Sequence, residues 1–245
     1  MRYLILSDIH GNWEALQAVL AAAGDRYDKV VCLGDIVGYG ADPNAVIDWV
    51  RENVEDVIRG NHDKACCGLE DMITFNPVAR RAAEWTMSVL RRDNREFLRD
   101  LARGPREVDG FLMVHGSILD EDEYLIDPYD ALFQFPHAEG RLVFFGHTHV
   151  QGGFLLWDAG KPAEAAKAKI QGEALRVIPG RTQLINPGSV GQPRDFVWQS
   201  GYAIYDSETR VVDFQRCSYD LATAQQKIRD AGLPPALADR LALGR

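Results

Sequence analysis

Apolar runs in this chain of 245 residues repeatedly end in a glycine, an acid or a histidine. The clearest case is the segment 143–150, in which Val-Phe-Phe leads into Gly146 and then into His147 and His149. A short apolar run of this kind predicts a buried strand, and Gly146 lets the backbone turn where the strand ends. Two imidazoles one residue apart at a strand end can share one small volume, and this suits a metal site.

The same pattern occurs at four other places, residues 2–7, 29–33, 56–59 and 110–114. The polar pieces that follow these runs are, in chain order, Asp8 with His10, Gly34 with Asp35, Gly60 to Asp63, and His115 with Gly116. All histidines except His137 fall in these pieces or in the 143–150 segment. Because buried Asp and His are costly unless they are paired or bound to metal, the pattern indicates a shared ligand site at a sheet edge.

Between the first predicted strands, apolar residues recur with the spacing of a helix. This spacing predicts helices over about 13–23, with Asn12 as a plausible N-cap, and over about 44–53. Alternating strands and helices favour an α/β fold in which ligands bind at the carboxyl ends of the strands. Residues 64–104 are predicted to form an arginine-rich helical insert whose arginines face solvent.

The second half is predicted to contain more strands. We expect a short helix near 128–135, strands near 152–157, 174–178, 182–185, 201–206 and 210–216, and closing helices over about 219–231 and 235–243. Without an internal repeat, a linker or a low-complexity tract, the sequence predicts one domain over residues 1–245, with the 64–104 insert as a cap within it.

Charge and composition exclude several classes of protein. A formal net charge of −9 argues against binding to duplex nucleic acid, although bound cations could still attract an anionic substrate. No run of 18 or so apolar residues predicts a membrane span, and the first strand meets Asp8 too early for a signal peptide, so we expect a cytoplasmic protein without membrane partners. Cys66 and Cys67 are expected to be reduced thiols on a helix.

Two metal ions held roughly 3.5–4 Å apart need an anionic bridge. Asp35 follows a glycine on a tight turn, so we expect its carboxylate to provide that bridge. Mixed carboxylate, amide and imidazole ligands suit Mn, Fe, Zn or Ni better than calcium.

Taken together and in order, Asp-x-His, Gly-Asp, Gly-Asn-His-Asp, His and Gly-His-x-His resemble the signature of the calcineurin-like metallophosphoesterase superfamily over about residues 1–150. The later segment 186–189, Asn-Pro-Gly-Ser, is similar to a loop of the small prokaryotic phosphodiesterase-like branch. The resemblance implies an α/β fold of the four-layer αββα sandwich type, with the site between the strand ends of the two sheets.

The resemblance also implies roles for single residues. One divalent ion would bind Asp8, His10, Asp35 and His149, and the other would bind Asp35, Asn61, His115 and His147. A hydroxide activated by both ions would attack phosphorus in line. His62 matches the position that contacts the phosphate and helps to protonate the leaving oxygen. Asp63 would either orient His62 or a neighbour, or start a helix.

The sequence departs from the Ser/Thr protein phosphatase branch, because no Asp-Arg pair follows Asp35. We therefore expect a metal-dependent phosphoesterase that hydrolyses a phosphodiester or phosphomonoester of a small molecule or nucleotide. A dinucleoside polyphosphate hydrolase is the first alternative, and a catalytically silent metal-binding scaffold is the second. Asn12, Tyr39 and Arg194 are candidate substrate contacts, and segments 64–104, 120–127 and 186–195 are expected to form the pocket walls. These residues fix neither the native metals nor the oligomeric state.

Overall fold

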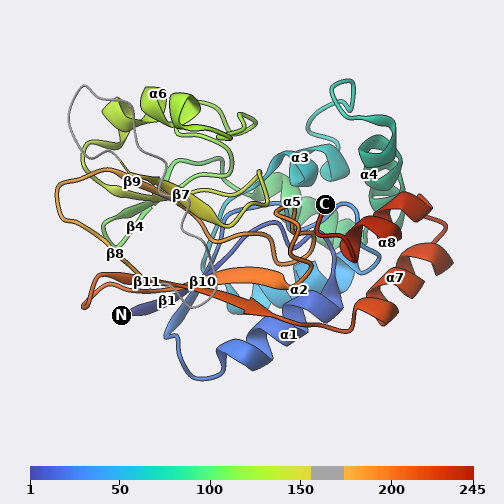
Figure 1. Cartoon of the computed structure of the whole chain (residues 1–245). Coiled ribbons are helices and arrows are strands. Elements are labelled where there is room, and N and C mark those ends of the chain that lie inside the picture. The colour runs from blue at the N-terminus through green and yellow to red at the C-terminus, as the bar shows by residue number, and fades with distance from the viewer. Residues whose placement is uncertain (156–173) are drawn as a thin grey trace.

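Two β-sheets packed face to face form the centre of the computed structural model, which describes residues 1–155 and 174–245 (Figure 1). In spatial order, sheet A contains β3 (Asp56–Val57), β2 (Lys29–Cys32), β1 (Arg2–Leu6), β10 (Ser200–Asp206), β11 (Val211–Cys217) and β8 (Ala174–Arg176). Sheet B contains, in the same way, β4 (Arg106–Val108), β5 (Phe111–Met113), β6 (Leu142–Phe144), β9 (Gln183–Asn186) and β7 (Gly152–Leu155).

Helices cover the outer faces of both sheets (Figure 1). They are α1 (Trp13–Ala23), α2 (Pro43–Asn53), α3 (Asn61–Cys67), α4 (Pro77–Val89), α5 (Arg92–Asp100), α6 (Pro128–Ala138), α7 (Leu221–Asp230) and α8 (Pro235–Leu241). Helix α6 packs on sheet B, whereas α1 and α2 pack on sheet A and the C-terminal helix α7 packs against α1. No helix in residues 1–155 or 174–245 has the length and apolar character needed to cross a bilayer.

Aromatic side chains fill the space between the sheets. Tyr3 of β1 meets Phe111 of β5 edge-on with ring centroids 5.2 Å apart, and Phe111 meets Phe144 of β6 in the same way at 5.3 Å. Each such pair contributes about 0.5–1.5 kcal/mol beyond the area that it buries. Two sheets around one core, each covered by helices, make the four-layer αββα sandwich that the resemblance implied.

Strand direction brings the polar pieces to one edge. β1, β2 and β3 are mutually parallel in sheet A, as are β5, β6 and β9 in sheet B. The five polar pieces that the sequence singled out follow β1, β2, β3, β5 and β6, and the piece after β3 includes the first turn of α3. Because parallel strands end at the same edge of a sheet, these five pieces meet where the carboxyl ends of the two sheets face each other.

Several element boundaries differ from the predicted ones. The third strand is only Asp56–Val57, because the chain then turns toward Gly60. The short edge strand Arg106–Val108 was not predicted. Helix α6 continues through Pro136 to Ala138 rather than ending near 135. The strand expected at 152–157 is observed as Gly152–Leu155, and residues 156 and 157 lie outside the described residues.

Three helices, α3, α4 and α5, occupy the predicted 64–104 insert. Their buried residues, such as Cys66, Ala82 and Leu98, belong to the same core cluster as the inner faces of α1 and α2. The insert therefore extends the helical layer of sheet A and also starts at a site residue, Asn61. Cys66 and Cys67 lie on α3 as free thiols. The single domain over 1–245 stays a prediction.

Candidate active site

Seven side chains that were predicted to bind metal gather at the common strand edge. Asp8, His10, Asp35 and His149 have ligand atoms within 4.8 Å of one another, and all four are buried. Asp35, His115 and His147 form a second buried group under the same distance limit. Asn61 joins the second group, because its Oδ1 lies 3.4 Å from His115 Nε2. Asp35 belongs to both groups.

The backbone at this edge is strained. Five of the seven predicted ligands are non-glycine residues with positive φ, namely Asp8 (52°), His10 (51°), Asp35 (52°), His147 (64°) and His149 (58°). Such conformations cost of order 1–3 kcal/mol each and persist only where the surrounding structure enforces them. Their concentration at one edge indicates that the fold tolerates strain there to aim these side chains at a common point.

Gly60 lets the two sheets' loops approach closely enough to build the cluster. A Cβ at this position would lie 2.2 Å from Asp35 Oδ1 and 2.7 Å from His115 Cε1. No larger residue fits without displacing both side chains. The close packing of Asp35 and His115 therefore requires a glycine at position 60.

Backbone carbonyls fix the orientation of the imidazoles. Nδ1 of His10, His115 and His149 donates to the carbonyls of Val37 (2.9 Å), Leu33 (2.8 Å) and Gln192 (2.5 Å), respectively. A carbonyl only accepts, so the proton must sit on Nδ1, and in the neutral ring Nε2 presents a lone pair to the cluster. His147 has the opposite arrangement, since its Nε2 donates to the Asp122 carbonyl at 3.1 Å and leaves Nδ1 free.

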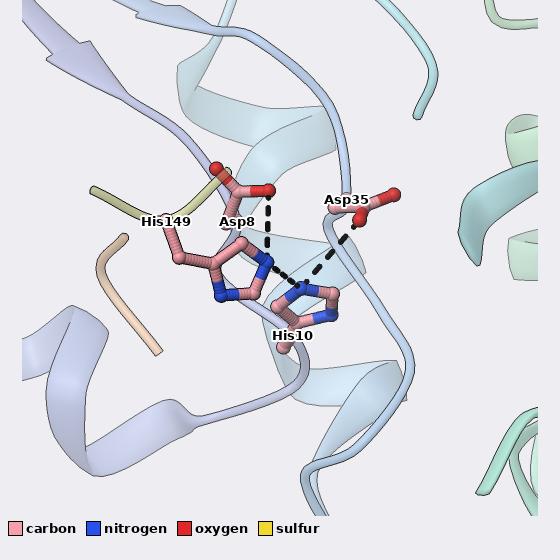
Figure 2. A group of neighbouring side chains, drawn as sticks. All are labelled: Asp8, His10, Asp35 and His149. Atoms are coloured by element: carbon pink, nitrogen blue, oxygen red, sulfur yellow. Dashed lines mark hydrogen bonds and ion pairs between the residues drawn. The ribbon is translucent and has the colours of Figure 1, made fainter. Parts of the chain in front are cut away.

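Figure 2 shows the first group with its ring nitrogens and carboxylates pointing toward one another. His10 Nε2 and His149 Nε2 are only 3.1 Å apart, His149 Nε2 is 3.4 Å from Asp8 Oδ1, and His10 Nε2 is 3.5 Å from Asp35 Oδ2. Two lone pairs this close repel unless a proton or a cation lies between them. Burial lowers the pKa of both His10 and His149, which opposes the proton and favours neutral metal ligands.

Asp35 is placed to serve both groups. Its Oδ2 lies 3.5 Å from His10 Nε2 and also 3.5 Å from His115 Nε2, while its Oδ1 accepts from the backbone N–H of His62 at 2.9 Å. Burial disfavours the charged form of His115, but the Asp35 and Asp8 carboxylates outweigh it and raise the pKa of His115 to about 10. The two carboxylates thus draw positive charge into the cluster, and divalent cations between them would provide it. The donor set fits two such ions.

His62 lies beside the cluster without belonging to either group. Its ring contacts those of His10, Tyr39 and Phe75, with centroids 4.4–4.9 Å apart. Nδ1 faces Gly38, where a Cβ would come within 2.5 Å, and has no hydrogen-bond partner in the described part of the chain. This leaves Nε2, on the opposite side of the ring, as the nitrogen available to a ligand. Burial lowers the pKa of His62 to about 4.

Two predicted site residues have structural roles. Asp63 accepts from the backbone N–H of Gly60 (2.9 Å), at the start of α3, and from that of Val37 (3.2 Å), the residue whose carbonyl holds His10. The structure thus shows the helix start and a contact to a neighbouring loop rather than to the His62 ring. Asn12 caps α1 through Ala15 N–H and donates to the Gly191 carbonyl at 2.9 Å. Because both ends of this amide are engaged by backbone, the predicted substrate contact by Asn12 is not supported.

Tyr39 and Arg194, the other two candidate substrate contacts, lie together at the rim. Arg194 donates to the Tyr39 hydroxyl at 3.3 Å, and its guanidinium carbon lies 5.6 Å from the centroid of the Tyr39 ring. Arg194 Nε is buried without a hydrogen-bond partner among the described residues. A guanidinium at this rim can donate to a phosphate oxygen through its terminal N–H groups.

A cavity of about 320 Å³ opens over the second ligand group. Its walls include Phe75 and Asn76 of the insert and Asp122 and Tyr124 of the acidic loop, as predicted, around Asn61, whereas the third predicted wall, segment 186–195, does not line it. Tyr124 was missed by sequence reasoning although its ring stacks on His147, with centroids 3.8 Å apart. No motif marks it, since an exposed tyrosine in an acidic loop has no distinctive spacing.

The fold is thus an αββα sandwich of the phosphoesterase type. Its candidate site is the buried group of Asp and His side chains at the carboxyl ends of the strands. A family model for the calcineurin-like phosphoesterase superfamily domain matches residues 1–210, and the chain belongs to this superfamily. An uncharacterized protein of Methanocaldococcus jannaschii is 37% identical over 254 aligned residues, which cover 98% of this chain and 97% of the relative.

Solved structures agree with this assignment. The crystal structure of a metallophosphoesterase from Sphaerobacter thermophilus is 40% identical, with a TM-score of 0.86 over 100% of this chain and 99% of that one. A hypothetical protein from Pyrococcus horikoshii, 22% identical, shares the fold with a TM-score of 0.77 over 100% of this chain and 98% of its own. The superfamily and the buried Asp and His groups fit a metal-dependent phosphoesterase.

Proposed function

We propose that this protein is a hydrolase that uses two divalent ions to cleave a phosphodiester or phosphomonoester of a small molecule or nucleotide. The observation that carries the proposal is the position of Asp35 Oδ2, 3.5 Å from an imidazole nitrogen of each ligand group. One carboxylate oxygen shared in this way suits two ions held a few ångströms apart. Mn, Fe, Zn or Ni suits the mixture of imidazole, carboxylate and amide ligands.

In this proposal, Asp8, His10, Asp35 and His149 hold one ion, and Asp35, Asn61, His115 and His147 hold the other. When bound, the ions supply Lewis acidity toward a phosphoryl oxygen and a nucleophile at neutral pH. Asp8 and Asp35 are the only carboxylates in the ligand set, so the loaded site keeps net positive charge and attracts an anionic phosphate.

The remaining residues act on the substrate. Arg194, held against Tyr39, binds phosphoryl oxygens through its guanidinium group. His62 faces the cavity from the side of Gly38 and delivers a proton from Nε2 to the leaving oxygen. The proton is favoured on this buried ring only when an anion is close, because burial otherwise lowers its pKa.

Hydrolysis of bis-p-nitrophenyl phosphate and p-nitrophenyl phosphate by metal-stripped protein tests the proposal. Mn²⁺, Ni²⁺, Zn²⁺ or Mg²⁺ is added back to the wild type, to Asp35→Asn and to Asp25→Asn, which makes the same chemical change at an exposed turn. We expect metal-dependent activity in the wild type and in Asp25→Asn only. Two bound ions without hydrolysis of either ester or of natural nucleotides would instead favour a metal-binding scaffold.

A further inference from the structure

A second cavity, of about 520 Å³, lies beside the ligand cluster and differs from the first in its chemistry. Its walls are mainly apolar and aromatic and include Tyr124, Ile126, Phe145, Phe154 and Phe196. Small-molecule sites are concave, mostly apolar and of this size. Ile126 and Phe196 are 73% and 72% exposed, so much of this apolar surface is open to solvent.

The second cavity is joined to the ligand cluster through shared residues. Tyr124 lines both cavities and stacks on His147. Thr148, which also lines the second cavity, stands in the chain between His147 and His149. Arg194 lines it as well and brings its guanidinium to within 3.3 Å of the Tyr39 hydroxyl in the first cavity. A phosphate at the cluster is therefore flanked by both cavities, of which the second is the more apolar.

We infer that the apolar cavity binds an aromatic ring system carried by the substrate's phosphate, so that the natural substrate is an aryl or nucleoside phosphoester. The inference rests on the proposed function for the position of the phosphate. Aromatic walls favour planar rings through offset and edge-to-face contacts. Arg194 also lines this cavity, and a guanidinium there can donate to the phosphate that carries the ring.

The direct test compares phosphodiesters that share p-nitrophenol as the leaving group and differ only in the other ester group. Methyl p-nitrophenyl phosphate lacks a second ring, whereas the p-nitrophenyl ester of thymidine 5′-phosphate carries a nucleoside. For the metal-loaded wild type we expect kcat/KM to be at least tenfold higher for the thymidine ester. Equal values for the two esters would overturn the inference.

Two matched double variants test whether the preference for the thymidine ester depends on the apolar cavity. Ile126→Asn with Phe196→Asn removes apolar surface from the cavity without adding charge, and Phe196 has a positive φ of 64° that asparagine tolerates. Tyr129→Asn with Phe133→Asn removes similar side chains, 67% and 71% exposed, from α6 outside the cavity. We expect the first pair to lower the thymidine-to-methyl ratio at least fivefold and the second pair to leave it unchanged. A ratio that both pairs preserve would overturn the inference.

A binding measurement separates this inference from the proposed function. Phenylphosphonate and methylphosphonate carry the same charged group and cannot be hydrolysed as esters. Calorimetric titration should show at least tenfold tighter binding of phenylphosphonate to the metal-loaded wild type, and the difference should shrink in Ile126→Asn with Phe196→Asn. Loss of all ester hydrolysis with this preference intact would refute the function alone, whereas hydrolysis without the preference would refute the aromatic subsite alone.

Discussion

The two ligand groups that share Asp35 are held in different ways. In the first group, His10 and His149 are 1% exposed and donate to carbonyls in loops of the sandwich core, those of Val37 and Gln192. In the second group, His147 depends on the carbonyl of Asp122, in a loop that also lines the cavity of about 320 Å³. The comparison suggests a preformed first metal position and a second position whose geometry is coupled to the substrate cavity.

Salt bridges tie that loop to the helical insert. Lys64 of α3 is 6% exposed and contacts Asp122 (2.7 Å), Glu121 (3.2 Å) and Glu70 (2.8 Å), while Arg59 also binds Glu121 at 2.9 Å. Since His147 Nε2 donates to the backbone of Asp122, this network positions a ligand of the second group only. The carbonyl partner of His10, Val37, belongs instead to the segment that follows Asp35, and its backbone N–H donates to Asp63 at 3.2 Å.

Asp35→Asn should have the largest effect, because it weakens both groups at once. We expect the loss in kcat/KM to exceed the roughly 10²–10³-fold typical of removing one electrostatic contact in an active site. Elemental analysis should find fewer than two metal equivalents per chain, while Asp25→Asn keeps the wild-type content. A variant that retains two equivalents would refute the shared role of Asp35.

Variants of single histidines should affect the two ligand groups separately. His10→Ala removes a ligand from the first group alone, and His147→Ala removes one from the second group alone. We expect each variant to keep about one metal equivalent and to lose most activity, with the remaining ion bound more tightly in His147→Ala, which leaves the preformed group intact. Equal residual affinities in titrations with a competing chelator would count against the difference between the two groups.

His62→Ala tests a residue outside both groups. We expect both metal equivalents to remain and turnover to fall by roughly 10²–10⁴-fold for esters with poor leaving groups. The fall should be much smaller for p-nitrophenyl esters, because p-nitrophenolate leaves without a proton. A plot of rate against leaving-group pKa measures this, and parallel lines for wild type and variant would rule out proton donation by His62.

Lys64→Met should have a smaller effect that is confined to the second group. It removes the cation that holds Asp122, and loss of such an outer support typically weakens metal binding by roughly 10–100-fold. Lys29→Met is the matched control, because Lys29 forms a long ion pair of 3.8 Å with Asp109 and its side chain is 37% exposed. Competition titrations should show one weakened equivalent in Lys64→Met. Two equally weakened equivalents would mean that the network supports the whole site.

Much of this arrangement could be predicted because its signals are local. An apolar run followed by Gly-Asp or His-x-His places a ligand at a strand end, and parallel strands place several strand ends together. The fold and the convergence of Asp8, His10, Asp35 and the other ligands followed from that pattern together with the family resemblance.

The supporting contacts could not be predicted, because they join residues far apart in the chain through groups that every residue carries. His115 donates to a carbonyl 82 positions away, that of Leu33, and His149 donates to the carbonyl of Gln192, 43 positions away. A backbone carbonyl has no sequence signature. For the same reason the positive φ of Asp35 and the stacking of Tyr124 on His147 emerge only from the assembled fold.

A crystal structure of the protein soaked in Mn²⁺, with anomalous differences, tests the shared-carboxylate site most directly. Two peaks should appear roughly 3.5–4 Å apart on either side of Asp35, the separation typical of two-metal sites. One should lie against His10 and His149, and the other against His115 and His147. A single peak, or two peaks without Asp35 between them, would contradict the account.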